Sequence, residues 1–174
     1  MYGISLRKNA PARWLTVTAM LMALNIAMSS FGVPVPGGHL YLNDAVICTA
    51  ALLLDPLGAF MVGGIGAFLG DFFFYPLPMF VSLAVHGLQA AAISLLVHRK
   101  DGAERMGAVV PALLLGVAIN VAGYSLGRAL VYATPHAAML KLPFQIFQAS
   151  FGAAAAYLLC FKAGLLSFWE RYTA

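Results

Sequence analysis

The sequence predicts an all-α integral membrane protein, a bundle of six transmembrane helices with both termini in the cytoplasm. Hydrophobic residues make up 62% of the 174-residue chain and charged residues 9%, against roughly 45–50% and about 25% in soluble domains. The mean hydropathy of +0.88 exceeds what a water-soluble fold of this size can bury. In addition, long apolar runs alternate with short segments rich in proline, glycine or charge.

Chain length sets the number of domains and excludes several classes of protein. A helical span needs about 20 residues, so a chain of this length holds at most about seven spans. We therefore expect a single transmembrane domain over residues 1–174, without a soluble catalytic or nucleotide-binding module. Cys48 and Cys160 lie in apolar runs without metal-ligand spacing, and no metal site is expected.

The first half of the chain is expected to hold three helices. The first covers about residues 14–31, an apolar run preceded by basic residues. Residues 33–43 contain two prolines and two glycines and are expected to form a long loop. Residues 44–74 are apolar again but are interrupted by Asp55-Pro56, which we interpret as a tight turn between the second and third helices.

The second half is expected to hold three more helices. They cover about residues 79–98, 107–133 and 142–166. A charged loop over residues 99–105 separates the first two, and a loop that contains a proline, residues 134–141, separates the last two.

Basic residues determine the number of spans and their orientation. As one helix, residues 44–74 would extend about 46 Å, which is long for one span and short for two. With six helices, most basic residues lie on the cytoplasmic side, as the positive-inside rule requires, and of the loop residues only Lys141 lies outside. The residues placed inside are Arg7, Lys8, Arg13, Arg99, Lys100, Arg105 and Arg171.

Polar side chains gather in the outer half of this bundle. Asn120, Tyr124 and Arg128 lie four residues apart, so they share one face of the fifth helix. Polar groups inside a span are costly and by default mark a site or a helix contact. Because the inner halves are apolar, we expect a pocket that opens outward, not a channel. The candidate binding residues are Asn25, His39, Tyr41, Asn43, Asp44, Asp71, Tyr75, His86, Gln89, Asn120, Tyr124, Arg128, Gln145 and Gln148.

Several of these residues also have simpler interpretations. Arg128 can snorkel to the outer surface or pair with Asp71, and Asp44 can act as a helix N-cap. The clustering of the whole set favours the pocket. The remaining alternatives are hydrogen bonding between helices for His86 and Gln89 and a place in the interfacial aromatic belt for Tyr41 and Tyr75.

A ridge of small residues follows the first helix. Ala19, Ala23 and Ala27 recur every four residues, and such ridges let another helix approach closely in lipid. Asn25 lies on the opposite face, roughly 200° away. We expect the ridge to contact a partner, with packing inside the bundle as the alternative.

The order of the motifs resembles a known family. A basic amino end and the alanine ridge are followed by Leu42-Asn-Asp-Ala45, Ala50-Ala-Leu-Leu-Leu-Asp-Pro-Leu-Gly58, Gly63-Gly-Ile-Gly66 and Gly70-Asp71. Over nearly the whole chain this order resembles the S components of energy-coupling factor (ECF) vitamin transporters, closest to the hydroxymethylpyrimidine, pyridoxine and riboflavin-type branch. Two segments depart from the family pattern: Asp55-Pro56 stands where Gly-Pro is commoner, and His86-Gly-Leu-Gln89 replaces a Lys-Gly-Leu-Glu-like stretch.

The resemblance implies a substrate-binding subunit of the bacterial cytoplasmic membrane. It would bind a water-soluble heterocyclic vitamin or precursor from outside, with hydroxymethylpyrimidine or pyridoxine favoured and riboflavin as another candidate. The vitamin is then the transported ligand, and no cofactor, nucleic acid or catalytic residue is expected. Ala19, Ala23 and Ala27 would contact a membrane coupling subunit (EcfT-like) that joins two ATPase subunits (EcfA-like).

Two other classes of protein remain as alternatives. A small membrane enzyme would use His86 and Asp71 as acid and base, but the sequence has no carboxylate pair or metal triad in support. A structural accessory subunit would account for the alanine ridge but leaves Arg128 without a role.

Overall fold

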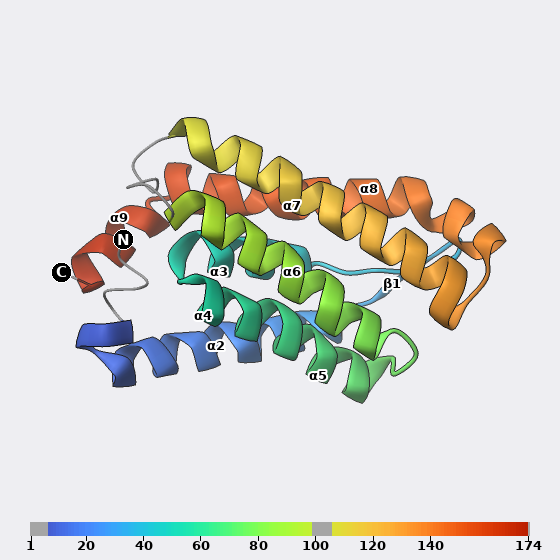
Figure 1. The fold of residues 1–174 in the computed structure, drawn as a ribbon, viewed down its shortest axis with the longest axis horizontal. Helices are drawn as coiled ribbons and strands as arrows, with labels where there is room; N and C mark the ends of the chain where they lie inside the picture. Colours follow the sequence, from blue (N-terminus) through green and yellow to red (C-terminus); the bar gives the residue numbers. More distant parts are fainter. Residues whose placement is uncertain (1–6, 99–105, 174) are drawn as a thin grey trace.

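The computed structural model describes residues 7–98 and 106–173. It is a helical bundle with one small β-hairpin (Figure 1), which confirms the all-α prediction. The predicted basic loop over residues 99–105 lies outside the described residues. The described elements are α2 (Pro11–Ser29), β1 (Val33–Val35), β2 (Gly38–Leu40), α3 (Asn43–Leu53), α4 (Pro56–Phe60), α5 (Gly66–Phe74), α6 (Met79–His98), α7 (Met106–Gly127), α8 (Pro135–Tyr157) and α9 (Leu165–Thr173), with π-helical turns η1 (Met61–Ile65), η3 (Arg128–Tyr132) and η4 (Leu158–Lys162).

Five helical stretches of the described residues are long and apolar enough to cross a membrane. The second predicted helix corresponds to α3, whose 11 residues extend only about 16 Å, less than the roughly 30 Å hydrocarbon core of a bilayer. The five stretches are Pro11–Ser29, Pro56–Phe74, Met79–His98, Gly107–Tyr132 and Pro135–Lys162.

The short helix α3 lies in the centre of the bundle, in contact with α2, α6 and α8 (Figure 1). Every side chain from Ile47 to Asp55 is buried. The start of α2 and α9 lie at one end, left in Figure 1, and the α5–α6 connection lies at the other. Large apolar side chains such as Met20, Phe73 and Leu130 are exposed on the outer helices, as expected for a surface that faces lipid.

The break between α3 and α4 is the predicted turn at Asp55-Pro56. Pro56 takes the first position of α4, where a missing N–H removes no helical hydrogen bond. Asp55 caps the helix by accepting a hydrogen bond from the Gly58 amide at 3.4 Å. Its carboxylate also accepts from Trp14 Nε1 at 2.7 Å and pairs with Arg7 at 3.0 Å. Asp55 therefore fastens the beginning of α2 to the turn.

Residues 33–43 are not an irregular loop, and the prediction was wrong here. They contain the antiparallel hairpin β1–β2, in which Val35 lies opposite Gly38. Gly37 and Gly38 have φ angles of +80° and +151°, which a residue with a Cβ rarely adopts. Pro36 and Gly37 connect the strands, and this pair is typical of a type II turn, which has proline first and a glycine of positive φ second.

The prediction of a loop over residues 134–141 is also wrong, because α8 begins at Pro135. Thr134 caps this helix by accepting a hydrogen bond from the Ala137 amide at 3.2 Å. Proline is favourable at the first helical position, so it starts the helix and does not mark a loop. As a result Lys141, predicted to lie in an outer loop, is inside α8 and only 1% exposed.

Asn25 joins α2 to the π-helical turn η1. Its Nδ2 donates a hydrogen bond to the Val62 carbonyl at 2.6 Å, at a turn whose backbone departs from the regular i to i−4 pattern. A Cβ on Gly66 would lie 2.8 Å from the same Asn25 nitrogen. The glycine therefore allows α5 to approach α2 closely.

Replacing Asp55 with alanine is expected to lower the stability of the detergent-solubilised protein. The Trp14 N–H would remain buried without its acceptor, which costs about 1–3 kcal/mol. Thermal unfolding measures the change. The matched control is Arg7→Gln, which removes only the partly exposed ion pair and should change stability by less than about 1 kcal/mol. Equal effects of the two variants would contradict this account of the turn.

Candidate functional site

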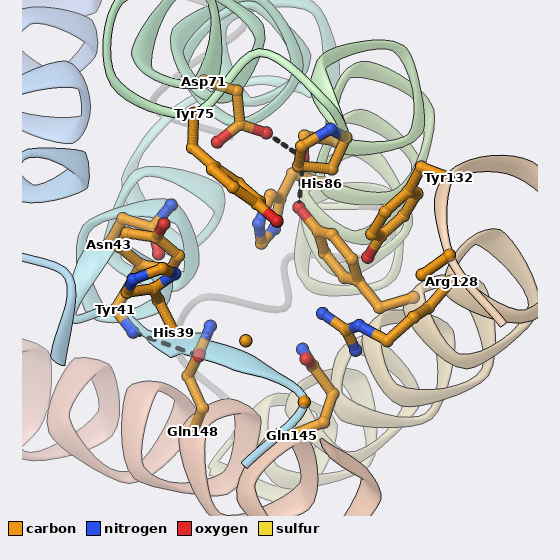
Figure 2. A pocket seen from close by; sticks show the side chains of 16 residues that line it. His39, Tyr41, Asn43, Asp71, Tyr75, His86, Arg128, Tyr132, Gln145 and Gln148 are labelled. Atoms are coloured by element: carbon orange, nitrogen blue, oxygen red, sulfur yellow. Dashed lines mark hydrogen bonds between the residues drawn. The ribbon is translucent and has the colours of Figure 1, made fainter. Parts of the chain in front are cut away.

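A cavity opens at the end of the bundle where the hairpin, the α5–α6 connection and η3 meet. Its volume is about 70 Å³. Figure 2 shows lining side chains from these elements, and from α6 and α8, around one open space. The lining residues are Gly37, Gly38, His39, Tyr41, Asn43, Asp71, Tyr75, Pro78, Ser82, His86, Tyr124, Arg128, Tyr132, Ala133, Gln145 and Gln148.

Most of the candidate binding residues lie on this lining, although they are spread over the whole sequence. Asn25 is the exception that lies elsewhere, between α2 and η1, because its amide donates to the Val62 carbonyl. Asp44, Gln89 and Asn120 lie beneath the lining. The candidates on the lining itself are His39, Tyr41, Asn43, Asp71, Tyr75, His86, Tyr124, Arg128, Gln145 and Gln148.

Asp44 is the centre of a buried hydrogen-bond network below the cavity. Its Oδ1 accepts from Asn120 Nδ2 at 2.9 Å and from Gln89 Nε2 at 3.3 Å. Its Oδ2 accepts from Gln148 Nε2 at 2.8 Å. The N-cap of α3 is Leu42, without a side-chain cap, so the alternative role of Asp44 as a helix cap is wrong. The carboxylate instead joins α3 to α6, α7 and α8.

Asn120, a candidate binding residue, is not part of the cavity lining but supports the lining from below. It is 0% exposed, and besides Asp44 it donates to Gln89 Oε1 at 3.0 Å. Its own carbonyl accepts from Gln145 Nε2 at 2.6 Å. Gln89 Oε1 also lies 2.9 Å from His86 Nδ1, and this acceptor assigns the ring proton to Nδ1. The network thus orients His86 and Gln145, which both reach the cavity.

A second cluster lies on the α5–α6 side of the cavity. The Ser82 hydroxyl donates a short hydrogen bond to Asp71. Because Ser82 has only one hydroxyl proton, the Tyr124 hydroxyl, 2.5 Å away, donates to Ser82. The ring of Tyr124 stands edge-on to His86, with centroids 5.1 Å apart. The Asp71 carboxylate therefore accepts its hydrogen bond from Ser82, within this cluster.

Two buried cations lie on the opposite side. Lys141 Nζ donates to the His39 carbonyl at 2.5 Å. Arg128 is 8% exposed, and its guanidinium lies over the ring of Tyr132, 5.5 Å from the centroid. Within the part of the chain that the structure describes, Arg128 has no ion pair, so pairing with Asp71 is not what holds it.

Three polar atoms of the lining are buried without a hydrogen-bond partner among the described residues. They are His39 Nδ1, Asn43 Oδ1 and the Tyr132 hydroxyl. Buried polar groups are normally satisfied, and leaving one unpaired costs about 1–3 kcal/mol. All three are covered by neighbouring atoms, so a molecule in the cavity pairs with them only if these side chains turn toward it.

The hairpin covers the cavity and is held on two sides. Toward α8, the Tyr41 amide donates to Gln148 Oε1 at 3.1 Å. Toward α5, the His39 ring packs edge-on against Tyr75, with centroids 5.6 Å apart. Burial, with a contribution from the charge of Asp71, raises the pKa of Tyr41 to about 12. Its hydroxyl therefore stays protonated at neutral pH.

Sequence reasoning missed several lining residues. Ser82 lies four residues before His86, and Tyr132 lies four residues after Arg128, so helical spacing from known candidates was the signal that could have found them. The glycines and Ala133 offer backbone and space, not a polar side chain, and gave no signal. The missed residues are Gly37, Gly38, Pro78, Ser82, Tyr132 and Ala133.

The chemistry of the cavity is that of recognition. Aromatic rings, amides and single charged groups are suited to orienting a small polar molecule. Among residues 7–98 and 106–173, no cluster of three or more His, Cys, Asp or Glu side chains could hold a metal ion.

The family is decided by a comparison with protein-family models. The model described as ECF-type riboflavin transporter, S component, matches residues 10–164 of the chain. The chain belongs to this family of S components. No curated protein matches it at a significant level.

Membership in this family confirms the ECF S component inferred from the motifs. The family consists of transporter subunits, and together with the five apolar helices it identifies the S component as a multi-pass membrane protein. The branch within the family stays a prediction.

Replacing Asn120 with alanine is expected to destabilise this S component. The change removes the amide that donates to Asp44 and Gln89 and the carbonyl that accepts from Gln145. Each buried partner left without a hydrogen bond costs about 1–3 kcal/mol. Thermal unfolding in detergent measures the loss. Val117→Ala, about one helical turn before Asn120, serves as the control and should cost about 1 kcal/mol. If Asn120→Ala were no worse than this control, the network would not be a structural constraint.

Proposed function

We propose that this S component is the high-affinity substrate-binding subunit of an ATP-driven ECF uptake transporter. Its ligand is a small water-soluble heterocyclic vitamin or vitamin precursor that enters from the outside. The observation that carries the proposal is the cavity, in which His39 Nδ1, Asn43 Oδ1 and the Tyr132 hydroxyl lack partners among the described residues. A bound ligand supplies the missing hydrogen bonds once these covered side chains turn toward it.

The shape and chemistry of the cavity support a flat, hydrogen-bonding ring. Tyr75, Tyr124 and Tyr132 provide aromatic surfaces, against which a planar ring packs favourably. Gln145 and Gln148 provide amides that orient the ring edge. We favour hydroxymethylpyrimidine or pyridoxine as ligand, and because the matching family model is described as a riboflavin transporter S component, riboflavin is tested beside them.

The proposed topology has six membrane crossings in one domain, with both termini in the cytoplasm. Its support is the course of the chain in Figure 1, where α2 runs toward the cavity end, α3 returns, and α4–α5, α6, α7 and α8 then alternate in direction. In this topology α3 and the hairpin together make the second crossing. The cavity end then faces the outside, and the membrane is the bacterial cytoplasmic membrane.

The proposed partners are an EcfT-like coupling subunit and two EcfA-like ATPases, on which ATP hydrolysis takes place. Ala19, Ala23 and Ala27 are the proposed contact, and all three are exposed on α2. Asn25, on the other face of α2, is buried against η1. This division supports a role of the ridge outside the bundle, since internal packing would bury the alanines.

A binding experiment tests the function. The detergent-purified chain is expected to retain a small heterocycle that mass spectrometry identifies, and to bind it in titrations without ATP. Tyr124→Ala should weaken this binding by roughly 5- to 150-fold, because a buried hydrogen-bonding group is lost. Val117→Ala, outside the lining, should leave affinity near that of the parent. Conversion of the ligand into a product would overturn the proposal.

Replacing Ala23 with leucine tests the partner surface. The larger side chain should prevent close approach of a neighbouring helix, and abolish ATP-dependent uptake in vesicles that contain the coupling module. Ligand binding by the isolated subunit should remain unchanged, because Ala23 is exposed and far from the lining. The matched control is Leu24→Ala, which reduces an exposed side chain on the same helix. Lost binding with intact assembly would indicate internal packing.

A further inference from the structure

Arg128 is a buried cation whose charge nothing in the described chain balances. It is 8% exposed and lines the cavity, and Figure 2 shows its guanidinium directed into the open space. Among residues 7–98 and 106–173 its guanidinium has neither a hydrogen bond nor an ion pair. A buried charge is normally paired, since its transfer out of water is otherwise very unfavourable.

A second cation lies beside it under the hairpin. A Cβ on Gly38 would be 3.7 Å from Arg128 Nη2 and 4.0 Å from Lys141 Cδ, so both side chains pack against the same glycine. Lys141 donates to the neutral His39 carbonyl, which leaves its positive charge uncompensated as well. The hydroxyl of Tyr132, over whose ring Arg128 lies, is buried without a partner. Positive charge and a free donor therefore meet at one place in the cavity.

The carboxylates of the site are occupied elsewhere. Asp44 accepts hydrogen bonds from side chains of three other helices below the cavity. Asp71 accepts from Ser82 on the α5–α6 side. The cavity is thus polarised, with acceptors on the α5–α6 side and cations on the side of η3 and α8.

We propose that the transported ligand carries a carboxylate or a phosphate group, which binds the Arg128 guanidinium. Such a ligand is an acidic heterocycle, in place of the hydroxymethylpyrimidine and pyridoxine favoured above on the resemblance alone. The planar guanidinium fork matches carboxylate or phosphate oxygens with paired charge-assisted hydrogen bonds. Lys141 adds to the local positive potential without contacting the ligand. This inference rests on the proposed function, because it takes the cavity as the substrate site.

Pairs of planar heterocycles that differ in charge test the inference. Pyridine-3-carboxylate is compared with its carboxamide, pyridoxate with pyridoxine, and riboflavin 5′-phosphate with riboflavin, by calorimetry and by thermal shift on the purified full chain. The anionic member of at least one pair is expected to bind at least about tenfold more tightly than its neutral partner. Arg128→Gln should abolish this preference, and Arg128→Lys should retain part of it.

Arg13→Gln is the matched control, because Arg13 also lies over a tyrosine, 5.8 Å from the Tyr172 centroid, but at the other end of the bundle. It should keep the preference for the anion. A parent protein that binds the neutral members as tightly, or no anionic member at millimolar concentration, overturns the inference even if Arg128→Gln fails to fold. Tight binding of riboflavin that is unchanged in Arg128→Gln overturns the anionic group yet leaves the proposed function intact, whereas turnover of the ligand overturns the function itself.

Discussion

The buried carboxylate of Asp44 is the constraint on which the cavity end of the bundle depends. A carboxylate taken out of water must be matched by donors in good geometry. Here Gln89, Asn120 and Gln148 supply them from three different helices. These helices can satisfy the charge in only one relative arrangement, so the network fixes their register. The same network orients His86 and Gln145, which line the cavity above it.

Close helix contacts make this network possible. A Cβ on Gly152 would lie 2.4 Å from Asp44 Cβ and 2.8 Å from its backbone carbonyl carbon, so only glycine allows α8 to come this near to α3. Gln148 precedes Gly152 by one helical turn and lies on the same face, which brings its amide within reach of the carboxylate. Gly152 therefore allows the close approach of α8 that the hydrogen bond from Gln148 to Asp44 requires.

Sequence reasoning succeeded for residue types that are energetically favourable in only one environment of a membrane protein. Apolar runs located the long helices, Asp55-Pro56 marked the break after α3, and the polar residues were correctly expected to come together at one end. It was less informative where a residue has two roles. Pro135 starts a helix as readily as it interrupts one, and Gly37 belongs to hairpins as well as to loops.

Sequence reasoning could not predict which polar side chains hydrogen-bond to one another and which remain without a partner. Asn120 and Arg128 lie two turns apart on one helix face, yet Asn120 is saturated by neighbours and Arg128 is not. The difference arises from partners on other helices, at sequence separations that no local pattern encodes.

The hairpin is held more firmly on its α8 side than on its α5 side. On the α8 side, hydrogen bonds from Lys141 and to Gln148 hold the strand and the following residue. On the α5 side, only the edge-on ring contact between His39 and Tyr75 closes the mouth in the described chain. Ring contacts can slide without leaving a polar group unpaired, whereas the α8 bonds cannot be broken so cheaply. Opening the cavity on the Tyr75 side therefore breaks no hydrogen bond of the hairpin, whereas opening it on the α8 side breaks two.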